Sequence, residues 1–247
     1  MRIAVGCSIL TLLVCGVSGQ SLDSRDRVFY LTHTATVQQF REVATVIRTI
    51  ADIQQVATDD DQKSVTVRAT PGQIAMAEWL FNELDTQTIQ TSVPHQYLVP
   101  GSSDDVIRLF YLTDTATVQD FQEAATLVRT IANFRRAFTY NERRAYVVRG
   151  TPAQIGLAEW LLVRLDPAAN PSSSEYRMPG SNDDVVQVLH LANTSTVKDF
   201  QKAATAIREA TQIQRLFTYN RPRAVAVRGT ADQIALAQRL ATDLDKP

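Results

Sequence analysis

The chain carries one sequence pattern three times, and this repetition restricts its fold more than any other feature. The copies match at residues 30–37, 111–118 and 190–197, and again at residues 67–70, 148–151 and 227–230. Each copy closes on a Leu-Asp pair, at 84–85, 165–166 and 244–245. A unit of roughly 60 residues is larger than a helical solenoid repeat. Each copy is therefore expected to be a small domain.

Within the second copy, the residue patterns predict two helices and three strands. Residues 106–112 are apolar and β-prone, which predicts a strand. Apolar residues then recur at helical spacing, and Thr117 is placed to cap that helix. Two short strands follow around a turn near Asn141, and Thr151-Pro152 begins a second helix. The predicted fold is α+β: three tandem βαββα domains, each a three-stranded sheet with two helices on one face.

The first strand of the second copy is apolar on both of its faces. Leu109 and Tyr111 alternate with Phe110 and Leu112, so neither side of the sheet suits solvent. The helices of the same copy cover only one side. We therefore expect a neighbouring domain, or another subunit, to cover part of the second side.

The first 19 residues have the pattern of a secretory signal peptide. Met1-Arg2 is positive, residues 3–14 form a short apolar run, and small residues precede a cleavage site after Gly19. The run is too short to cross a membrane, which takes about 20 apolar residues. Lipidation at Cys15 is an alternative form of processing. Export predicts a bacterial periplasmic or outer-membrane-associated protein, or a secreted one, without a transmembrane segment in the mature chain.

The start of the second helix in each copy, and the residues that close it, resemble those of a known family. A Val-Arg-Gly-Thr-Pro helix start at 148–152, a Leu-Asp end and the βαββα order resemble the secretin N-domains, which are KH-like periplasmic modules. The resemblance implies modules that stack into rings and dock protein partners. It divides the chain into a signal peptide (1–19), repeats at 20–85, 106–166 and 185–247, and linkers at 86–105 and 167–184. No pore domain follows within these residues, so only the module role is carried over.

Catalytic and nucleic-acid-binding patterns are weak. The three histidines, His33, His95 and His190, are not expected to converge, and the linker serines at 172–174 have no nearby base. Both cysteines, Cys7 and Cys15, lie in the signal peptide. The net charge is -1, and the only GXXG spacing of a nucleic-acid-binding KH module is at 16–19. We therefore expect no enzyme, no cofactor, no metal and no nucleic acid.

Charge distinguishes the copies most clearly. Residues 27–85 hold 5 basic and 8 acidic residues, residues 106–166 hold 8 and 6, and residues 185–245 hold 8 and 5. The differences gather at the predicted hairpins and just before the second strand of each copy. Either these are solvated tips, or opposed charges there set the register of docking. The candidate partner surface consists of Asp59, Asp60, Asp61, Arg135, Arg136, Arg143, Arg144, Arg215, Arg221 and Arg223.

These patterns favour one function and leave a second open. The first is an exported, non-enzymatic assembly or adaptor protein that binds other proteins in or near a secretion or pilus system. Its expected partners are proteins, with copies of itself in a ring or stack as a further hypothesis. The alternative is a periplasmic ligand-binding or enzyme-regulating protein that reuses the fold.

Overall fold

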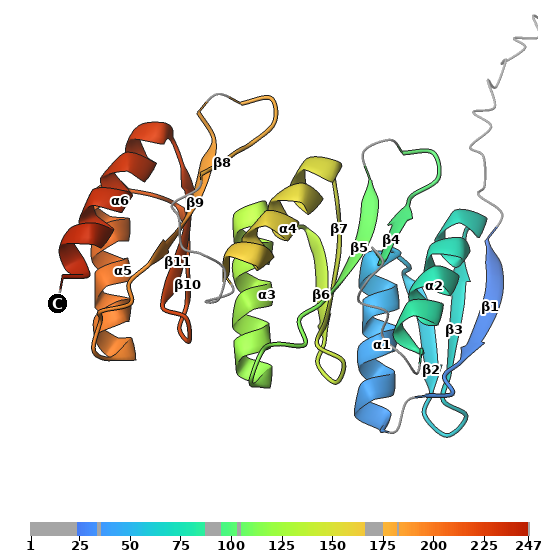
Figure 1. Cartoon of the computed structure of the whole chain (residues 1–247). Helices are drawn as coiled ribbons and strands as arrows, with labels where there is room; N and C mark the ends of the chain where they lie inside the picture. Colours follow the sequence, from blue (N-terminus) through green and yellow to red (C-terminus); the bar gives the residue numbers. More distant parts are fainter. Residues whose placement is uncertain are drawn as a thin grey trace, which may run out of the picture.

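The computed structural model describes residues 24–33, 36–86, 95–102, 105–165, 175–181 and 183–246. The predicted signal peptide at 1–19 and the linker serines at 172–174 lie outside these residues. The described part contains six helices and three antiparallel sheets, which confirms the α+β prediction. Each unit places its two helices on the same face of its sheet (Figure 1).

The first unit has the predicted βαββα order. Its sheet has the strand order β1-β3-β2, so the last strand of the unit lies in the middle. The elements are β1 (Arg25–Tyr30), α1 (Val37–Ile50), β2 (Gln55–Asp59), β3 (Ser64–Ala69) and α2 (Pro71–Leu84).

The second and third units repeat this order, and each adds one strand in front of it. The second unit consists of β4 (His95–Leu98), β5 (Val106–Tyr111), α3 (Val118–Ala132), β6 (Arg136–Tyr140), β7 (Ala145–Gly150) and α4 (Pro152–Leu165). The third consists of β8 (Tyr176–Arg177), β9 (Val185–His190), α5 (Val197–Thr211), β10 (Arg215–Tyr219), β11 (Ala224–Gly229) and α6 (Ala231–Leu244).

The added strands give these two sheets four strands, where three were predicted. Their orders are β4-β5-β7-β6 and β10-β11-β9-β8. The cause is the Pro-Gly turn of each connector: Gly101 and Gly180 have φ of 80° and 81°, a conformation that glycine adopts without strain. The turn folds the connector back, so that Leu98 pairs with Val106. Residues that the sequence analysis placed in linkers therefore belong to the sheet of the following unit.

The predicted helix starts are present. Thr117 Oγ1 accepts a hydrogen bond from the Asp120 amide at 3.0 Å, and Thr151 Oγ1 accepts one from the Gln154 amide at 3.3 Å. These bonds satisfy N–H groups that have no partner inside the helix. Gln154 Nε2 also donates to the carbonyl oxygen of Ala132 at 3.0 Å, at the end of α3. One glutamine side chain thus joins the start of the second helix to the end of the first.

Candidate interaction surfaces

The second face of the second sheet is covered by a helix of the first unit. Val46 and Ile50 of α1 are fully buried, and they belong to one buried cluster with side chains of the following sheet. Those sheet residues are Ile107, Leu109, Tyr140, Ala145 and Val147. The expectation that a neighbouring domain covers this face is confirmed.

The same arrangement recurs between the second and third units. Leu127 and Ile131 of α3 are fully buried, and their cluster includes Val186, Tyr219, Ala224 and Ala226 of the third sheet. In Figure 1 the three units accordingly follow one another in a row, with the helices of each unit facing the sheet of the next. The described units form a stack with two internal interfaces.

A glutamate on each covering helix binds the hairpin of the next unit. Glu42 accepts two hydrogen bonds from Asn141, one from its amide at 3.0 Å and one from Nδ2 at 3.1 Å. Glu123 accepts the same two bonds from Asn220, at 3.1 and 3.0 Å. Bonds to an ionised acceptor are roughly twice as strong as neutral ones. We call this pair of bonds the glutamate–asparagine contact, and it fixes the register of each hairpin on its helix.

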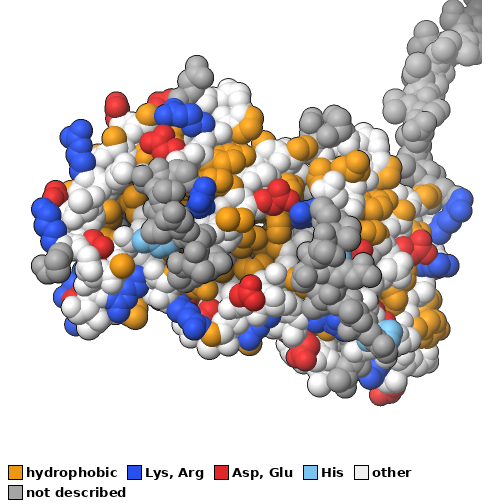
Figure 2. All heavy atoms as spheres, in the orientation of Figure 1, with side chains coloured by type: hydrophobic (Ala, Val, Ile, Leu, Met, Phe, Trp, Pro, Cys, Tyr) orange, Lys and Arg blue, Asp and Glu red, His pale blue; other side chains and the backbone are white. Residues whose placement is uncertain are grey.

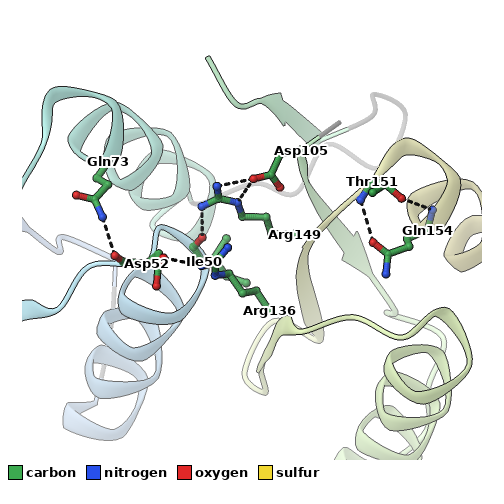
Figure 3. Close-up of polar contacts among 8 residues, drawn as sticks. All are labelled: Ile50, Asp52, Gln73, Asp105, Arg136, Arg149, Thr151 and Gln154. Atoms are coloured by element: carbon green, nitrogen blue, oxygen red, sulfur yellow. Dashed lines mark hydrogen bonds and ion pairs between the residues drawn. The ribbon is translucent and has the colours of Figure 1, made fainter. Parts of the chain in front are cut away.

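An arginine near the end of the central strand of the second and third sheets binds the C-terminal end of the helix that covers that sheet. Arg149 Nη1 donates to the Ile50 carbonyl oxygen at 3.1 Å, and the guanidinium also binds Asp105 through Nε at 2.8 Å (Figure 3). Arg228 repeats this with the Ile131 carbonyl at 2.8 Å and with Asp184 at 2.7 Å. The arginines satisfy helix C-terminal carbonyls, which otherwise have no partner. The hydrogen bond from Arg228 holds the pKa of Asp184 below its usual range.

The second helix of each unit contacts the added strand of the next. Trp79 of α2 and Tyr97 of β4 have ring centroids 5.6 Å apart, and Trp160 of α4 and Tyr176 of β8 have theirs 5.5 Å apart. Such aromatic pairs contribute about 0.5–1.5 kcal/mol beyond the area they bury. Near the first pair, Tyr111 Oη donates to the Glu83 carbonyl at 3.2 Å, and burial raises the pKa of Tyr111 to about 12. Both helices of a unit therefore bind the unit that follows.

Two arginines of the predicted partner surface bind across these interfaces. Arg136 Nη2 lies 2.5 Å from Asp52 Oδ2 of the first unit, as Figure 3 shows. Arg221 Nη1 lies 3.2 Å from Asp120 Oδ2 of the second unit. These two pairs place opposed charges across the interfaces between neighbouring units of the same chain.

Other predicted residues support their own units. Arg223 donates to Thr194 Oγ1 at 3.1 Å and to the Ser195 carbonyl at 3.2 Å. Arg144 lies over the Phe121 ring, with its guanidinium carbon 6.0 Å from the ring centroid. Both arginines have a φ of 50° at their hairpin turns. Arg223 thus holds the loop in front of α5, and Arg144 packs on the first turn of α3.

The remaining predicted residues differ in exposure. Asp59 Oδ1 accepts the Asp61 amide at 3.1 Å within its own turn, and Asp60 binds Arg41 at 2.5 Å. Asp61 and Arg135 are exposed, whereas Arg143 and Arg215 are half-buried. Binding of an external partner by these residues stays a prediction.

The most specific interface residues were absent from the predicted surface. They are Glu42, Glu123, Asn141, Asn220, Arg149 and Arg228. The repeat itself contained a signal for them. The glutamate is the same in the first two copies, at Glu42 and Glu123, and the asparagine is the same in the last two, at Asn141 and Asn220. Identical polar residues at equivalent positions beside buried ones are the signal.

The part of the chain that the structure describes has no group of three or more His, Cys, Asp or Glu side chains that could hold a metal ion. His33 lies 3.5 Å from Asp85 and His95 lies 2.6 Å from Glu83. None of the helices in the described ranges is both long and apolar enough to cross a membrane.

The geometry defines a class of protein: a linear stack of βαββα modules joined by repeated helix-on-sheet interfaces. No family model and no curated protein sequence matches the chain. Similar solved structures are ExeD of Aeromonas hydrophila (12% identity, TM-score 0.21), the pilotin–secretin complex of AspS and GspD from ETEC (16%, 0.22) and the XcpQ fragment N012 (14%, 0.29).

The matches cover 91%, 92% and 90% of this chain, respectively. The chain spans only 41% and 38% of the first two matched chains, and 99% of the XcpQ fragment. The AspS–GspD structure is a complex of a pilotin with a secretin.

Proposed function

We propose that the chain is an exported, non-enzymatic assembly component that binds other proteins in or near a bacterial secretion or pilus system. The observation that carries the proposal is the covering of the second and third sheets by a helix of the preceding unit. Domains of one chain move relative to one another unless their interface is large and hydrophobic. Here each interface is continuous with the hydrophobic core of the preceding unit. The chain therefore acts as a stiff spacer that holds its surfaces at fixed separations.

The hairpins supply the surface that such a spacer would present. The β2–β3, β6–β7 and β10–β11 hairpins point toward the same edge of the stack in Figure 1. Their exposed tips include Asp61, Glu142 and Arg221. One edge thus displays three similar hairpins with different charges, a pattern that lets otherwise similar modules select different neighbours.

The family resemblance of the sequence supports the choice of partner class. Secretin N-domains are periplasmic modules that dock proteins, and the predicted signal peptide would deliver this chain to the same compartment. Recovery of the protein from a periplasmic fraction, with an N-terminus at Gln20, tests the export part of the proposal. An intact Met1 terminus on cytoplasmic material would contradict it.

Site-specific photo-crosslinking in the native cell tests the binding part. A crosslinker at Asp61 or Arg221 is expected to capture a secretin, a pilus protein or another component of the same machine. Val163 on α4 is 61% exposed and away from the hairpin tips, and it provides the control position. Adducts of equal yield from all three positions, or none with envelope proteins, would overturn the proposal.

A further inference from the structure

The outer face of the first sheet has lost most of the apolar residues that its counterparts carry, although Val28 and Tyr30 remain there and are 41% and 58% exposed. Strand register makes the positions equivalent: Thr66 pairs with Ala57 as Val147 pairs with Phe138. Five apolar positions of the second sheet are thereby replaced by small or polar residues. The equivalent positions in the first sheet, in the order of Ile107, Phe138, Tyr140, Ala145 and Val147, hold Asp26, Ala57, Asp59, Ser64 and Thr66.

The outer face of the third helix pair has changed in part in the same way, although Leu236 and Leu244 of α6 remain apolar and are 41% and 42% exposed. The place of Val46 and Leu127 is taken by Ala206, and that of Ile50 and Ile131 by Ala210. Both alanines are exposed, although their large counterparts are fully buried. The position of Trp79 and Trp160 holds Arg239. In Figure 2 charged side chains of both signs are interspersed at this end of the molecule.

The specific contacts are missing from both outer faces as well. Lys202 occupies the position at which Glu42 and Glu123 accept their hydrogen bonds, and its ammonium group can only donate hydrogen bonds. Asp60 stands where Asn141 and Asn220 donate theirs. Neither outer face can form the glutamate–asparagine contact.

Lys202 and Asp60 have opposite charges, so a second copy docked end to end would bring them together. Two observations and one energetic argument oppose such docking. Asp60 is already bound to Arg41 at 2.5 Å, and Asp199 would face Asp61 where Asp120 faces Arg221. Exposed charge pairs also contribute little compared with burial of large apolar side chains. The electrostatic exchange does not replace the lost hydrophobic contacts.

We infer that the two outer faces cap the stack, so that copies of this chain do not join end to end through the interface that joins their units. Repeat proteins need terminal units with a polar outer face to stay soluble, because an exposed interface would recruit further copies. The inference is independent of the proposed function, and it leaves the long sides of the stack for binding partners.

Sedimentation of the mature chain and of two restored variants tests the inference. Variant N carries Asp26→Ile, Ala57→Phe, Asp59→Tyr, Asp60→Asn and Thr66→Val. Variant C carries Lys202→Glu, Ala206→Leu, Ala210→Ile and Arg239→Trp. Each restores one outer face to the pattern of an internal interface, and circular dichroism checks that each is folded.

The wild type is expected to show no end-to-end association from micromolar to hundreds of micromolar concentration. Variants N and C are expected to form a one-to-one complex when mixed, which the wild type does not form with either. Wild-type self-association that Lys202→Glu abolishes would overturn the inference, as would folded variants that fail to pair. Self-association that Lys202→Glu and Asp60→Lys both leave unchanged would place the contact on the long sides and support it.

Discussion

Arg149 of β7 donates a hydrogen bond to the carbonyl oxygen of Ile50, a residue 99 positions earlier in the chain, at 3.1 Å. The same guanidinium binds Asp105 in its own unit. One side chain therefore links a helix end, a connector and a central strand. Arg68 is the equivalent residue in the first unit, where no covering helix precedes it among the described residues.

Arg149→Leu is expected to lower the free energy of unfolding by about 1–3 kcal/mol, because it leaves the half-buried Asp105 and the Ile50 carbonyl without their donor. Arg68→Leu is the matched control. The Arg68 side chain is 60% exposed, so its removal should change stability by no more than about 0.5 kcal/mol. Urea denaturation followed by circular dichroism measures both. Equal losses for the two variants would contradict an interface role for Arg149.

Glu42→Ala is expected to weaken the coupling between the first and second units. It removes the acceptor for two hydrogen bonds from Asn141, and a bond to a charged group contributes about 1.5–3 kcal/mol. Relative to wild type, the variant should show faster amide hydrogen exchange in the first unit and unchanged exchange in the third. Lys202→Ala, at the same place in α5, is the control and should leave exchange unchanged. Exchange rates in the first unit of Glu42→Ala that equal those of wild type would refute the prediction.

Gly150→Ala is expected to destabilise the chain more than Gly229→Ala does. A Cβ at either residue would crowd a flexible glutamine, at 2.7 Å from Gln154 Oε1 or 2.6 Å from Gln233 Oε1, so this contact does not separate the two variants. The difference is the ring: a Cβ at residue 150 would lie 2.8 Å from buried Phe134, whereas at residue 229 the nearest hydrophobic atom, of Ile213, is 3.3 Å away. Forced shifts in a packed core cost about 1–3 kcal/mol. Melting temperatures compare the two variants. The order would be wrong if Gly229→Ala melted lower.

Asp184 is expected to make the stability of the third unit sensitive to acid. Its folded-state pKa is lowered, chiefly by the hydrogen bond from Arg228, so its contribution is present above the unfolded value of 3.8 and is lost as the pH falls through the lower folded value. The melting temperatures of wild type and Asp184→Asn should therefore differ at neutral pH and converge below pH 3.8. A difference that persists unchanged in acid would contradict this account.

The repeat allowed most of the fold to be predicted, because periodicity and caps are local. Thr117 and Thr151 cap the helices they were assigned to, and a covered second face was correctly inferred from the apolar strand at 106–112. Its placement around Phe110 and Leu189 was wrong, because both residues pack against the helices of their own units. Strands β4 and β8 were missed as sheet members, because their pairing depends on a turn that returns the chain rather than on their own four or two residues. The function of the tips is the part that local patterns do not determine.

The candidate site was only partly predicted, for a different reason. Charge at the hairpins was recognised, and Arg136 and Arg221 do form ion pairs between units. Glu42 and Asn141 carry the more specific contact, and neither stands out by charge density or motif. Which of many solvated-looking polar residues meets another depends on how whole units are placed, and that placement is a long-range property.

Because the second and third sheets are each covered by a helix of the preceding unit, the interfaces also have an order in time. A ribosome, or an export channel, releases the chain from its N-terminus. α1 therefore appears before β5, β6 and β7, and α3 before β9, β10 and β11. Each new sheet emerges when the surface that will shield its outer face has already been made. The apolar outer faces of the second and third sheets are thus exposed to solvent for only a short time. In an unfinished chain, the last complete unit exposes the helix face that will cover the next sheet.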